Sequence, residues 1–376
     1  MPLRRHSTIE QIDAAEWNRL VGTDMPFLRH EYLAALERHG AVGGDSGWRP
    51  CYLTLEECGS LRGAVPMYFK DHSFGEFVFD WAWAVACERG GMSYYPKLVV
   101  AVPYTPVTGR RLLYTEDAPA LRDRLIEGAL DYAREAGVSS LHWLFTAPED
   151  TAALRRHGLL GRTGCQFHWH NRGYGDFDGF LASFSARHRK KVRGERRAVR
   201  EQGIKVEVLM GNTADDAVWD CFHRFYLGTF EKKGSPAPLS RGFFRDIAAS
   251  LGDSVVLILA RHAGEYVAGA LFYASGDTLY GRHWGSTGEF RQLHFELCYY
   301  AAIEYCLARG LRRFEAGAQG EYKIRRGFEP TPTHSLHWLA EPGFRAAVGD
   351  FLVREGRAME NYLREMRDQL PFKDAG

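Results

Sequence analysis

The sequence predicts an α+β protein of two tandem halves, each a mixed, mainly antiparallel sheet flanked by helices. Its length of 376 residues exceeds one ordinary domain of roughly 100 to 200 residues. A weak internal repeat, in which hairpin, strand and helix patterns recur, indicates that the halves are related. The hydrophobic share of 45% and the charged share of 25% are typical of globular proteins, so each half can bury its own core.

Each half contains a β-hairpin pattern. Residues 48–70 alternate and turn near residues 57–60, and residues 255–273 turn at residues 263–265. Residues 277–284 alternate again and predict a further strand in the second half.

A helix that leads into a strand follows in both halves, over residues 125–144 and 296–315. Apolar residues recur at i, i+3 and i+4, and each helix stops at a glycine suited to the left-handed conformation, Gly137 or Gly310. The same offset of 169 residues relates the His-Trp pair ending at Trp169 to the one ending at Trp338. We therefore predict the order hairpin, strand, helix, strand, helix, strand in each half.

The boundary between the halves is predicted in the Gly- and Asp-rich segment 171–178. This gives a first domain over residues 1–172 and a second over residues 173–341, which opens with a basic helix. Residues 342–376 form a helical tail with an apolar stripe, and we expect the tail to pack on the second domain.

Charge and cysteine content exclude several functional classes. The net charge of +1 argues against a generally nucleic-acid-binding surface. Seven cysteines without a CxxC pair signal neither a disulfide framework nor a zinc site. The chain starts without an apolar leader, and no stretch approaches the roughly 18 apolar residues of a membrane span, so a cytoplasmic protein is expected.

Five segments, taken together, resemble signatures of the FemAB-like family of the GNAT (N-acyltransferase) superfamily, which is associated with peptidoglycan synthesis. They are residues 79–84, 102–113, 185–197, 276–285 and 314–328. The resemblance covers about residues 20–370 and implies two GNAT folds in tandem, with a site in the second half and in the cleft between halves. It implies an N-acyl or N-aminoacyl transferase whose amine acceptor is a small molecule or peptide, such as a cell-wall precursor.

The donor is expected to be either acyl-CoA or aminoacyl-tRNA, which would act as a co-substrate. No tightly bound cofactor is expected. Members of the wider Fem group resemble aminoacyl-tRNA-dependent transferases, which would make tRNA a partner. The acetyl-CoA turn of GNAT enzymes carries a glycine pair, and after Trp284 only Gly288 stands in a suitable place. The alternative to a transferase is a non-catalytic GNAT-like module that binds peptidoglycan precursor or RNA.

Two basic segments are candidates for binding the donor phosphates. Residues 186–202 hold eight Arg and Lys against two Glu, and four of the arginines form one helical stripe able to grip phosphates. In residues 315–328 two glycines form a loop, followed by three basic residues. The resemblance aligns Arg325 with a donor-associated lysine of Fem transferases, while Lys323 lies two positions earlier. The donor candidates are Arg189, Arg193, Arg196, Arg200, Gly317, Gly320, Lys323, Arg325 and Arg326; the alternatives are a solvated helix paired with Glu195 and Glu201, and a structural turn.

Transfer to an amine requires a proton acceptor near neutral pH. The catalytic candidates are His283, His294, Glu296 and Glu321, and Glu315 is a further one. The alternatives are structural roles for these residues, or catalysis by positioning without a base. Aromatic candidates for the acceptor site are Trp81, Trp83, Tyr104 and Trp284, with core packing as the alternative. His168 and His170 share one face of a strand but lack an evident third ligand, so no metal site is predicted.

Overall fold

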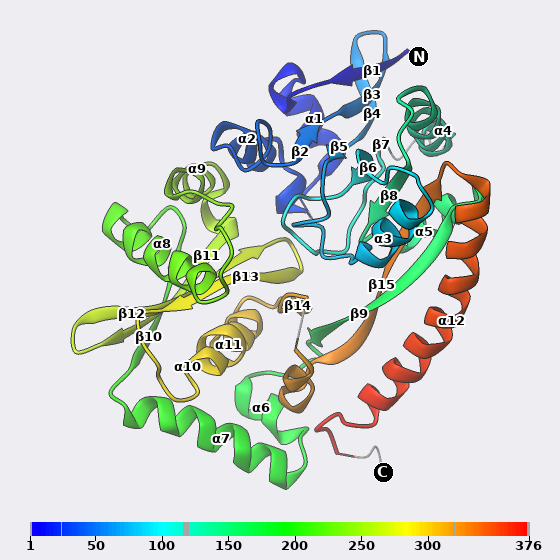
Figure 1. Cartoon of the computed structure of the whole chain (residues 1–376). Coiled ribbons are helices and arrows are strands. Elements are labelled where there is room, and N and C mark those ends of the chain that lie inside the picture. The colour runs from blue at the N-terminus through cyan, green and yellow to red at the C-terminus, as the bar shows by residue number, and fades with distance from the viewer. Residues whose placement is uncertain (1, 24, 116–119, 319, 374–376) are drawn as a thin grey trace. The chain divides into compact units, whose positions relative to one another are not determined.

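The computed structural model describes residues 2–23, 25–115, 120–318 and 320–373 (Figure 1). The chain divides into two compact units. Unit 1 comprises Met1–Cys165 and Pro332–Tyr362, and unit 2 comprises Gln166–Thr331 and Leu363–Gly376. This division differs from the predicted boundaries, because a late segment of the chain belongs to unit 1. None of the helices in the described ranges is long and apolar enough to cross a membrane.

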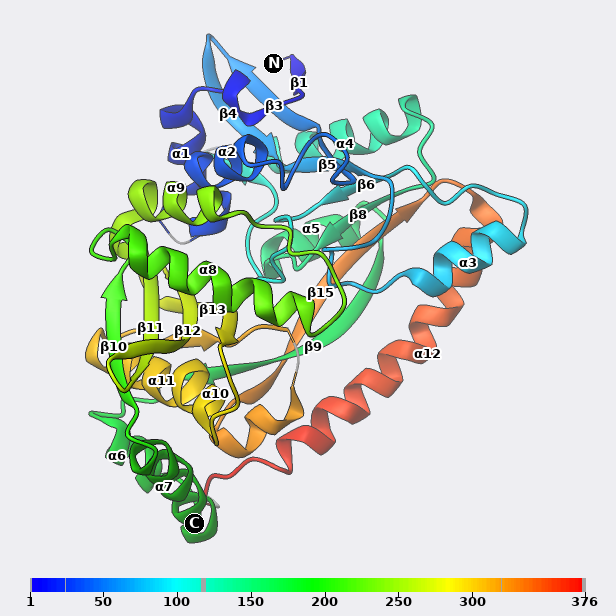
Figure 2. The ribbon, with the colours of Figure 1, turned by 60° about the vertical axis from the view of Figure 1, so that its left-hand side comes forward.

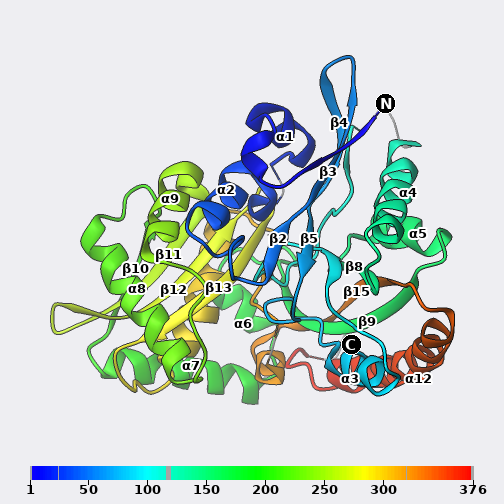
Figure 3. The same ribbon diagram turned by 45° about the horizontal axis from the view of Figure 1, so that its top comes forward.

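Unit 1 contains a four-stranded sheet in the order β1-β3-β4-β7 and, as part of a larger sheet, strands that follow one another in the order β2-β5-β6-β8-β15. The predicted first hairpin is confirmed as β3 and β4, where Glu57 faces Ser60, and Figure 3 shows it beside β1. The elements up to the end of the first repeat are β1 (Leu3–His6), η1 (Ile9–Gln11), α1 (Ala14–Val21), η2 (Pro26–Leu28), α2 (His30–Arg38), β2 (Trp48–Pro50), β3 (Tyr52–Glu57), β4 (Ser60–Val65), β5 (Met67–Lys70), α3 (Trp81–Arg89), β6 (Lys97–Val100), β7 (Leu113–Tyr114), α4 (Ala120–Glu135), β8 (Ser140–Leu144), α5 (Pro148–Arg156) and β9 (Leu160–His170).

Successive side chains of a strand point to opposite faces, and unit 1 uses the two faces differently. On one face Leu141 and Trp143 join the main apolar core with α4 and α5. On the other face His142 and Ser140 are buried with polar neighbours, and α3 covers them. The sheet of unit 1 therefore has one apolar and one polar buried face.

Unit 2 is built around β10, β11, β12, β13, β14 and the end of β9. Figure 2 shows α8 and α9 on one side of these strands and α10 and α11 on the other. The predicted second hairpin is confirmed as β11 and β12, with a turn at Ala263 and Gly264. The elements that follow β9 along the chain are α6 (Phe177–Ala182), α7 (Ala186–Glu201), β10 (Lys205–Met210), α8 (Asp216–Glu231), α9 (Arg241–Leu251), η3 (Gly252–Ser254), β11 (Val255–His262), β12 (Glu265–Ala274), β13 (Thr278–Ser286), α10 (Leu293–Phe295), the π-helix η4 (Glu296–Tyr300), α11 (Ala301–Ala308), β14 (Arg313–Glu315), η5 (Glu321–Arg326), β15 (Glu329–Leu339) and α12 (Pro342–Arg367).

The last strand of each predicted half ends in the unit that the other half mainly forms. β9 ends in unit 2, where Trp169 faces Phe314 of β14. β15 ends in unit 1, where Trp338 faces Leu141 of β8. The two Trp residues related by the repeat thus lie in the sheets of opposite units.

The tail is a single helix, α12, and its first turns pack in unit 1. Val348 and Leu352 lie in one apolar cluster with Trp83 and Tyr94. The sequence placed this tail on the second domain, and the difference follows from β15, which precedes α12 and ends in the sheet of unit 1. Residues from Leu363 onward belong to unit 2.

Candidate functional site

A cavity opens in unit 2 where two parallel strands separate. β13 and β14 pair over three residue pairs, the last being Tyr280 with Glu315. Past that pair, residues 281–284 and 316–318 line a cavity of about 160 Å³. In the ladder of β13 with β12, Gly281 faces Phe272 and His283 faces Leu271, so Arg282 is the extra residue of a bulge. A bulge leaves main-chain groups outside the ladder and redirects side chains.

Lys323 is the buried amine of this cavity. Two glycines with positive φ, Gly317 (84°) and Gly320 (114°), turn the chain from β14 into η5, which carries the lysine. The side chain is 2% exposed, and its Nζ donates a hydrogen bond to the carbonyl of Gly317 at 2.9 Å. Burial, together with the positive charge of Arg282, lowers the pKa of Lys323 to about 7.

Aromatic rings form the opposite wall. The ring centroids of Trp284 and His294 lie 5.2 Å apart, and those of His294 and Tyr299 lie 5.4 Å apart. Tyr299 and Cys298 belong to the π-helix η4, and both line the cavity. An isolated π turn inside a helix is frequent at functional sites, because it offsets the side chains from their regular rows.

The two histidines of the cavity are weak bases. Burial and the neighbouring positive charges lower the pKa of His283 to about 3 and that of His294 to about 4. Both imidazoles are therefore neutral at pH 7 and hold a proton poorly.

Glu296 faces away from this cavity toward α7. Its Oε1 lies 2.8 Å from Nη2 of Arg196, whose Nη1 lies 2.6 Å from Oε1 of Glu304. Burial raises the pKa of the Glu296 carboxyl, and the guanidinium opposes that rise. The structure thus uses Arg196 and Glu296 to join α7 to the helix η4–α11.

The remaining candidates from η5 lie in different environments. Arg326 is buried, and its Nη2 lies 2.9 Å from Oε1 of Glu195. Arg325 and Glu321 lie at the exposed surface of η5, outside the cavity.

The arginine stripe of α7 is also divided. Arg189 donates to the carbonyl of Phe184 at 3.0 Å, and Arg193 forms an exposed ion pair with Asp178. Arg200 lines a second cavity of about 540 Å³ between α7, β10 and α11, which Arg196 also lines. The stripe therefore does not present four guanidinium groups to one ligand.

The acceptor candidates differ in exposure. Trp284 lines the cavity of unit 2. In unit 1, Trp81 is 39% exposed and its ring centroid lies 5.0 Å from that of Phe74. Trp83 packs edge-on against His337, and Tyr104 donates its hydroxyl to the carbonyl of Ala41 at 2.8 Å, so both belong to the packed interior of unit 1.

Unit 1 also has a parallel strand pair, β6 and β8, but a side chain fills the space past it. Arg111 is fully buried, and its Nε donates to the carbonyl of Leu144, the last residue of β8, at 2.9 Å. Its Nη2 donates to the carbonyl of Val107, and its main-chain N–H donates to the carboxylate of Asp150. The guanidinium thus donates to main-chain carbonyls of unit 1, and Arg111 has a structural role.

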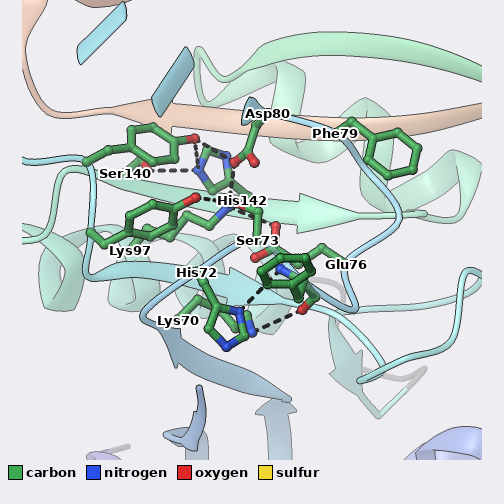
Figure 4. Close-up of polar contacts among 12 residues, drawn as sticks. Lys70, His72, Ser73, Glu76, Phe79, Asp80, Lys97, Ser140 and His142 are labelled. Atoms are coloured by element: carbon green, nitrogen blue, oxygen red, sulfur yellow. Dashed lines mark hydrogen bonds and ion pairs between the residues drawn. The ribbon is translucent and has the colours of Figure 1, made fainter. Parts of the chain in front are cut away.

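A buried charge cluster on the polar face of unit 1 was not predicted from the sequence (Figure 4). Lys97 is fully buried and donates to Ser73 Oγ and Glu76 Oε2, each at 2.8 Å, and to Asp80 Oδ2. Burial raises the pKa of Glu76 to about 7, although Lys97 opposes the rise. The segment between β5 and α3 supplies these three partners, while its aromatic side chains Phe74, Phe77 and Phe79 are exposed. The signal in the sequence was the pairing of acidic and aromatic residues in that segment.

The cluster continues along the sheet. Tyr94 donates to Asp80 Oδ2 at 2.6 Å, and the Nδ1 atoms of His142 and His337 lie 2.7 Å apart, so one ring donates to the other. Burial lowers the pKa of His142 to about 3. The histidine pair is therefore neutral and belongs to the packed interior.

Comparison with known proteins gives one family and a set of similar folds. The FemAB-like family model, described as peptidoglycan biosynthesis/recognition, matches residues 8–374. No curated protein sequence matches the chain.

Three solved structures share the fold over nearly the whole chain. The C-terminal domain (DUF2156) of a putative lysylphosphatidylglycerol synthetase from Agrobacterium fabrum is 12% identical, with 92% of this chain and 97% of that chain covered and a TM-score of 0.58. FemX is 13% identical, with 93% and 100% covered and a TM-score of 0.56. A conserved protein of unknown function from Bacteroides thetaiotaomicron is 8% identical, with 90% and 100% covered and a TM-score of 0.52. The predicted fold class, two tandem GNAT-like α+β units with a C-terminal helix, is confirmed.

Proposed function

Because the chain belongs to the FemAB-like family, we propose that it is a transferase that moves an acyl or aminoacyl group from an activated carrier to an amine. The observation that carries the proposal is the cavity between β13 and β14, which combines main-chain groups outside the ladder with the buried amine of Lys323. FemX and the putative lysylphosphatidylglycerol synthetase domain share the fold, which is consistent with this reaction class.

The proposed reaction forms one bond and breaks one. The nitrogen of the acceptor amine attacks the carbonyl carbon of the donor, a C–N bond forms, and the C–S or C–O bond to the carrier breaks. The amine releases one proton to water, and the departing sulfur or oxygen takes one up, so the proton count balances. Lys323 is assigned to holding the donor in place. The products are an amide and the free carrier thiol or hydroxyl. Main-chain N–H groups beside the Arg282 bulge are the proposed donors to the developing oxyanion.

The carrier is proposed to be either CoA or tRNA, and the acceptor a small-molecule or peptide amine such as a cell-wall precursor. Both carriers bring phosphates, which suit positive charge near the mouth of the cavity. Arg282 lines the cavity, and Arg325 lies on the same short helix as Lys323. The histidines are assigned to shaping the cavity, since their lowered pKa values make them poor proton acceptors.

The test is a transfer assay on the purified full chain, with acyl-CoAs and charged tRNAs as donors and a panel of amines as acceptors. Lys323→Gln should lower kcat/KM by about tenfold or more, because it removes a hydrogen bond between a charged group and the donor. Lys205→Gln, at an exposed lysine of β10, is the matched control and should leave the rate unchanged. Absence of transfer together with absence of donor binding would count against the proposal; binding of peptidoglycan precursor or RNA without turnover would support a non-catalytic module.

A further inference from the structure

Resting on the proposed function, we infer that the β13–β14 cavity takes a short acyl group that ends in a carboxylate, and that this carboxylate meets the Lys323 ammonium. The inference deepens the proposed function by naming the chemical class of the donor. It follows from the size of the cavity, from the charges that line it, and from the hydrogen-bond donors that Lys323 leaves unused.

The size limits the acyl group to a few heavy atoms. The cavity volume is about 160 Å³, and an engineered protein cavity of about 150 Å³ holds one benzene molecule. An acyl group of four carbons with a terminal carboxylate is of that scale. A long fatty acyl chain is not.

The charges that line the cavity are positive. Among its described lining residues, Arg282 and Lys323 are the basic ones, and none is an aspartate or glutamate. His283 and His294 add no negative charge in either protonation state. A terminal ammonium would therefore enter a cavity without a carboxylate to receive it, and leaving a buried charge unpaired is costly.

Lys323 has donor capacity left over. An ammonium has three N–H donors, and within the described part of the chain its hydrogen-bond acceptor is the carbonyl of Gly317, at 2.9 Å. The residue is 2% exposed, so bulk water supplies the missing acceptors poorly. A carboxylate in the cavity supplies two oxygens and the counter-charge, which offsets the cost of burying this lysine.

Three amides that share one carbonyl group and differ at the far end provide the test. Succinamate ends in a carboxylate, butanamide in a methyl group and 4-aminobutanamide in an ammonium. Their dissociation constants from the full chain are measured by ligand-detected NMR. We expect succinamate to bind about tenfold or more tightly than butanamide, the gain typical of a hydrogen bond to a charged group, and 4-aminobutanamide to bind most weakly.

Variants then assign the preference to one residue. Lys323→Met should make succinamate and butanamide bind equally, and Lys323→Gln is a second variant with a polar end. Lys205→Met is the matched control and should keep the wild-type order. Thermal unfolding checks that each variant is folded.

The inference and the proposed function can fail separately. Equal binding of succinamate and butanamide to the wild type, or tighter binding of 4-aminobutanamide, overturns the inference. If succinyl-CoA, butyryl-CoA, 4-aminobutyryl-CoA and the charged tRNAs all fail to donate while the Lys323-dependent preference persists, the proposed transfer is wrong and the inference about the cavity stands. If all three donate with equal kcat/KM, transfer is correct and the inference falls.

Discussion

Replacing Lys97 with methionine should lower the free energy of unfolding by about 3–5 kcal/mol, the usual cost of removing one partner from a buried ion pair. The Lys97 side chain is fully buried and donates to Ser73, Glu76 and Asp80 (Figure 4). Methionine fills similar space but leaves two carboxylates facing each other without a cation. Because neither carboxylate is exposed, water compensates little.

The loss should depend on pH in a direction set by the two carboxyl groups. Without Lys97, the folded-state pKa values of Glu76 and Asp80 rise above their unfolded values of about 4. Groups with a raised folded pKa stabilise the protein below the unfolded pKa, and that contribution is lost as pH rises through the folded pKa. The deficit of the variant should therefore grow with pH, at a limit of about 2.7 kcal/mol per unit for two protons.

Urea unfolding at pH 6 and pH 8.5, followed by tryptophan fluorescence, measures the deficit. Arg49→Met is the matched control, because its ion pair with Asp71 is half exposed and should be worth about 1 kcal/mol or less. Combining Lys97→Met with Glu76→Gln and Asp80→Asn should recover part of the loss and remove its pH dependence. A deficit below about 1 kcal/mol, or one that does not grow between the two pH values, would refute the reasoning.

Three further outcomes follow from the structure of unit 2. Burial depresses the pKa of Lys323 to about 7 from an unfolded value of about 10.4. The stability contributed by neutral Lys323 is therefore complete above a pH of about 10.4 and is lost as the pH falls to about 7. Lys323→Met should remove this rise in unfolding free energy, which is up to about 1.4 kcal/mol per pH unit, in urea titrations at pH 7.5 and 9.5. Arg326→Leu leaves the Glu195 carboxylate buried and should cost about 3–5 kcal/mol in the same assay, whereas Arg197→Leu, at an exposed side chain, should change stability by about 0.5 kcal/mol or less. Gly285→Ala would place its Cβ 1.9 Å from the carbonyl oxygen of Phe225 and should lower the unfolding midpoint by an amount corresponding to about 1–3 kcal/mol. Gly288→Ala is the control, because its Cβ would lie 3.7 Å from the nearest atom. Equal midpoints for the two variants would show that β13 shifts to accommodate the added methyl group.

Local elements could be predicted because local patterns determine them. Alternation predicted both hairpins and β13, and the structure confirms them. Gly137 and Gly310 have φ values of 63° and 66°, the left-handed conformation that a helix C-terminus favours in glycine. Each of these features depends on a few neighbouring residues.

The division of the chain into units could not be predicted in the same way. The offset between Trp169 and Trp338 relates β9 to β15, but a repeat does not say which sheet a strand joins. Strand pairing depends on partners far away in the sequence, here Phe314 for Trp169 and Leu141 for Trp338. The tail helix α12 begins in unit 1 because β15, which precedes it, ends there.

The candidate site was predicted in part. His283, Trp284, His294, Gly317 and Lys323 lie around one cavity, because they flank β13 and β14 where those strands separate. These residues were chosen for their position beside predicted strands, and strand pairing brought them together.

Charge spacing was a poorer guide. The predicted basic helix is present as α7, but Arg196 contacts Glu296, which lies 100 residues further along the chain. The sequence of α7 contains no signal for that partner. Roles in catalysis or donor binding stay predictions for these residues.

Hydrogen-bond saturation separates the structural cations of this protein from the candidate functional one. Lys97 has three N–H donors and three acceptors, and Arg111 donates to the carbonyls of Val107 and Leu144. Lys70 is intermediate, since it donates to one carbonyl and lies 3.9 Å from the centroid of the Trp48 ring, whose face attracts a cation. Among the residues that the structure describes, Lys323 has one acceptor, the carbonyl of Gly317, and it borders a cavity. A buried cation whose donors are all used by the chain stabilises the fold, whereas one with unused donors beside a cavity has both the charge and the space to hold a ligand. Arg111 and Lys323 each donate to a carbonyl at or just past the end of a strand in a parallel pair, so the number of acceptors is what distinguishes these two cations.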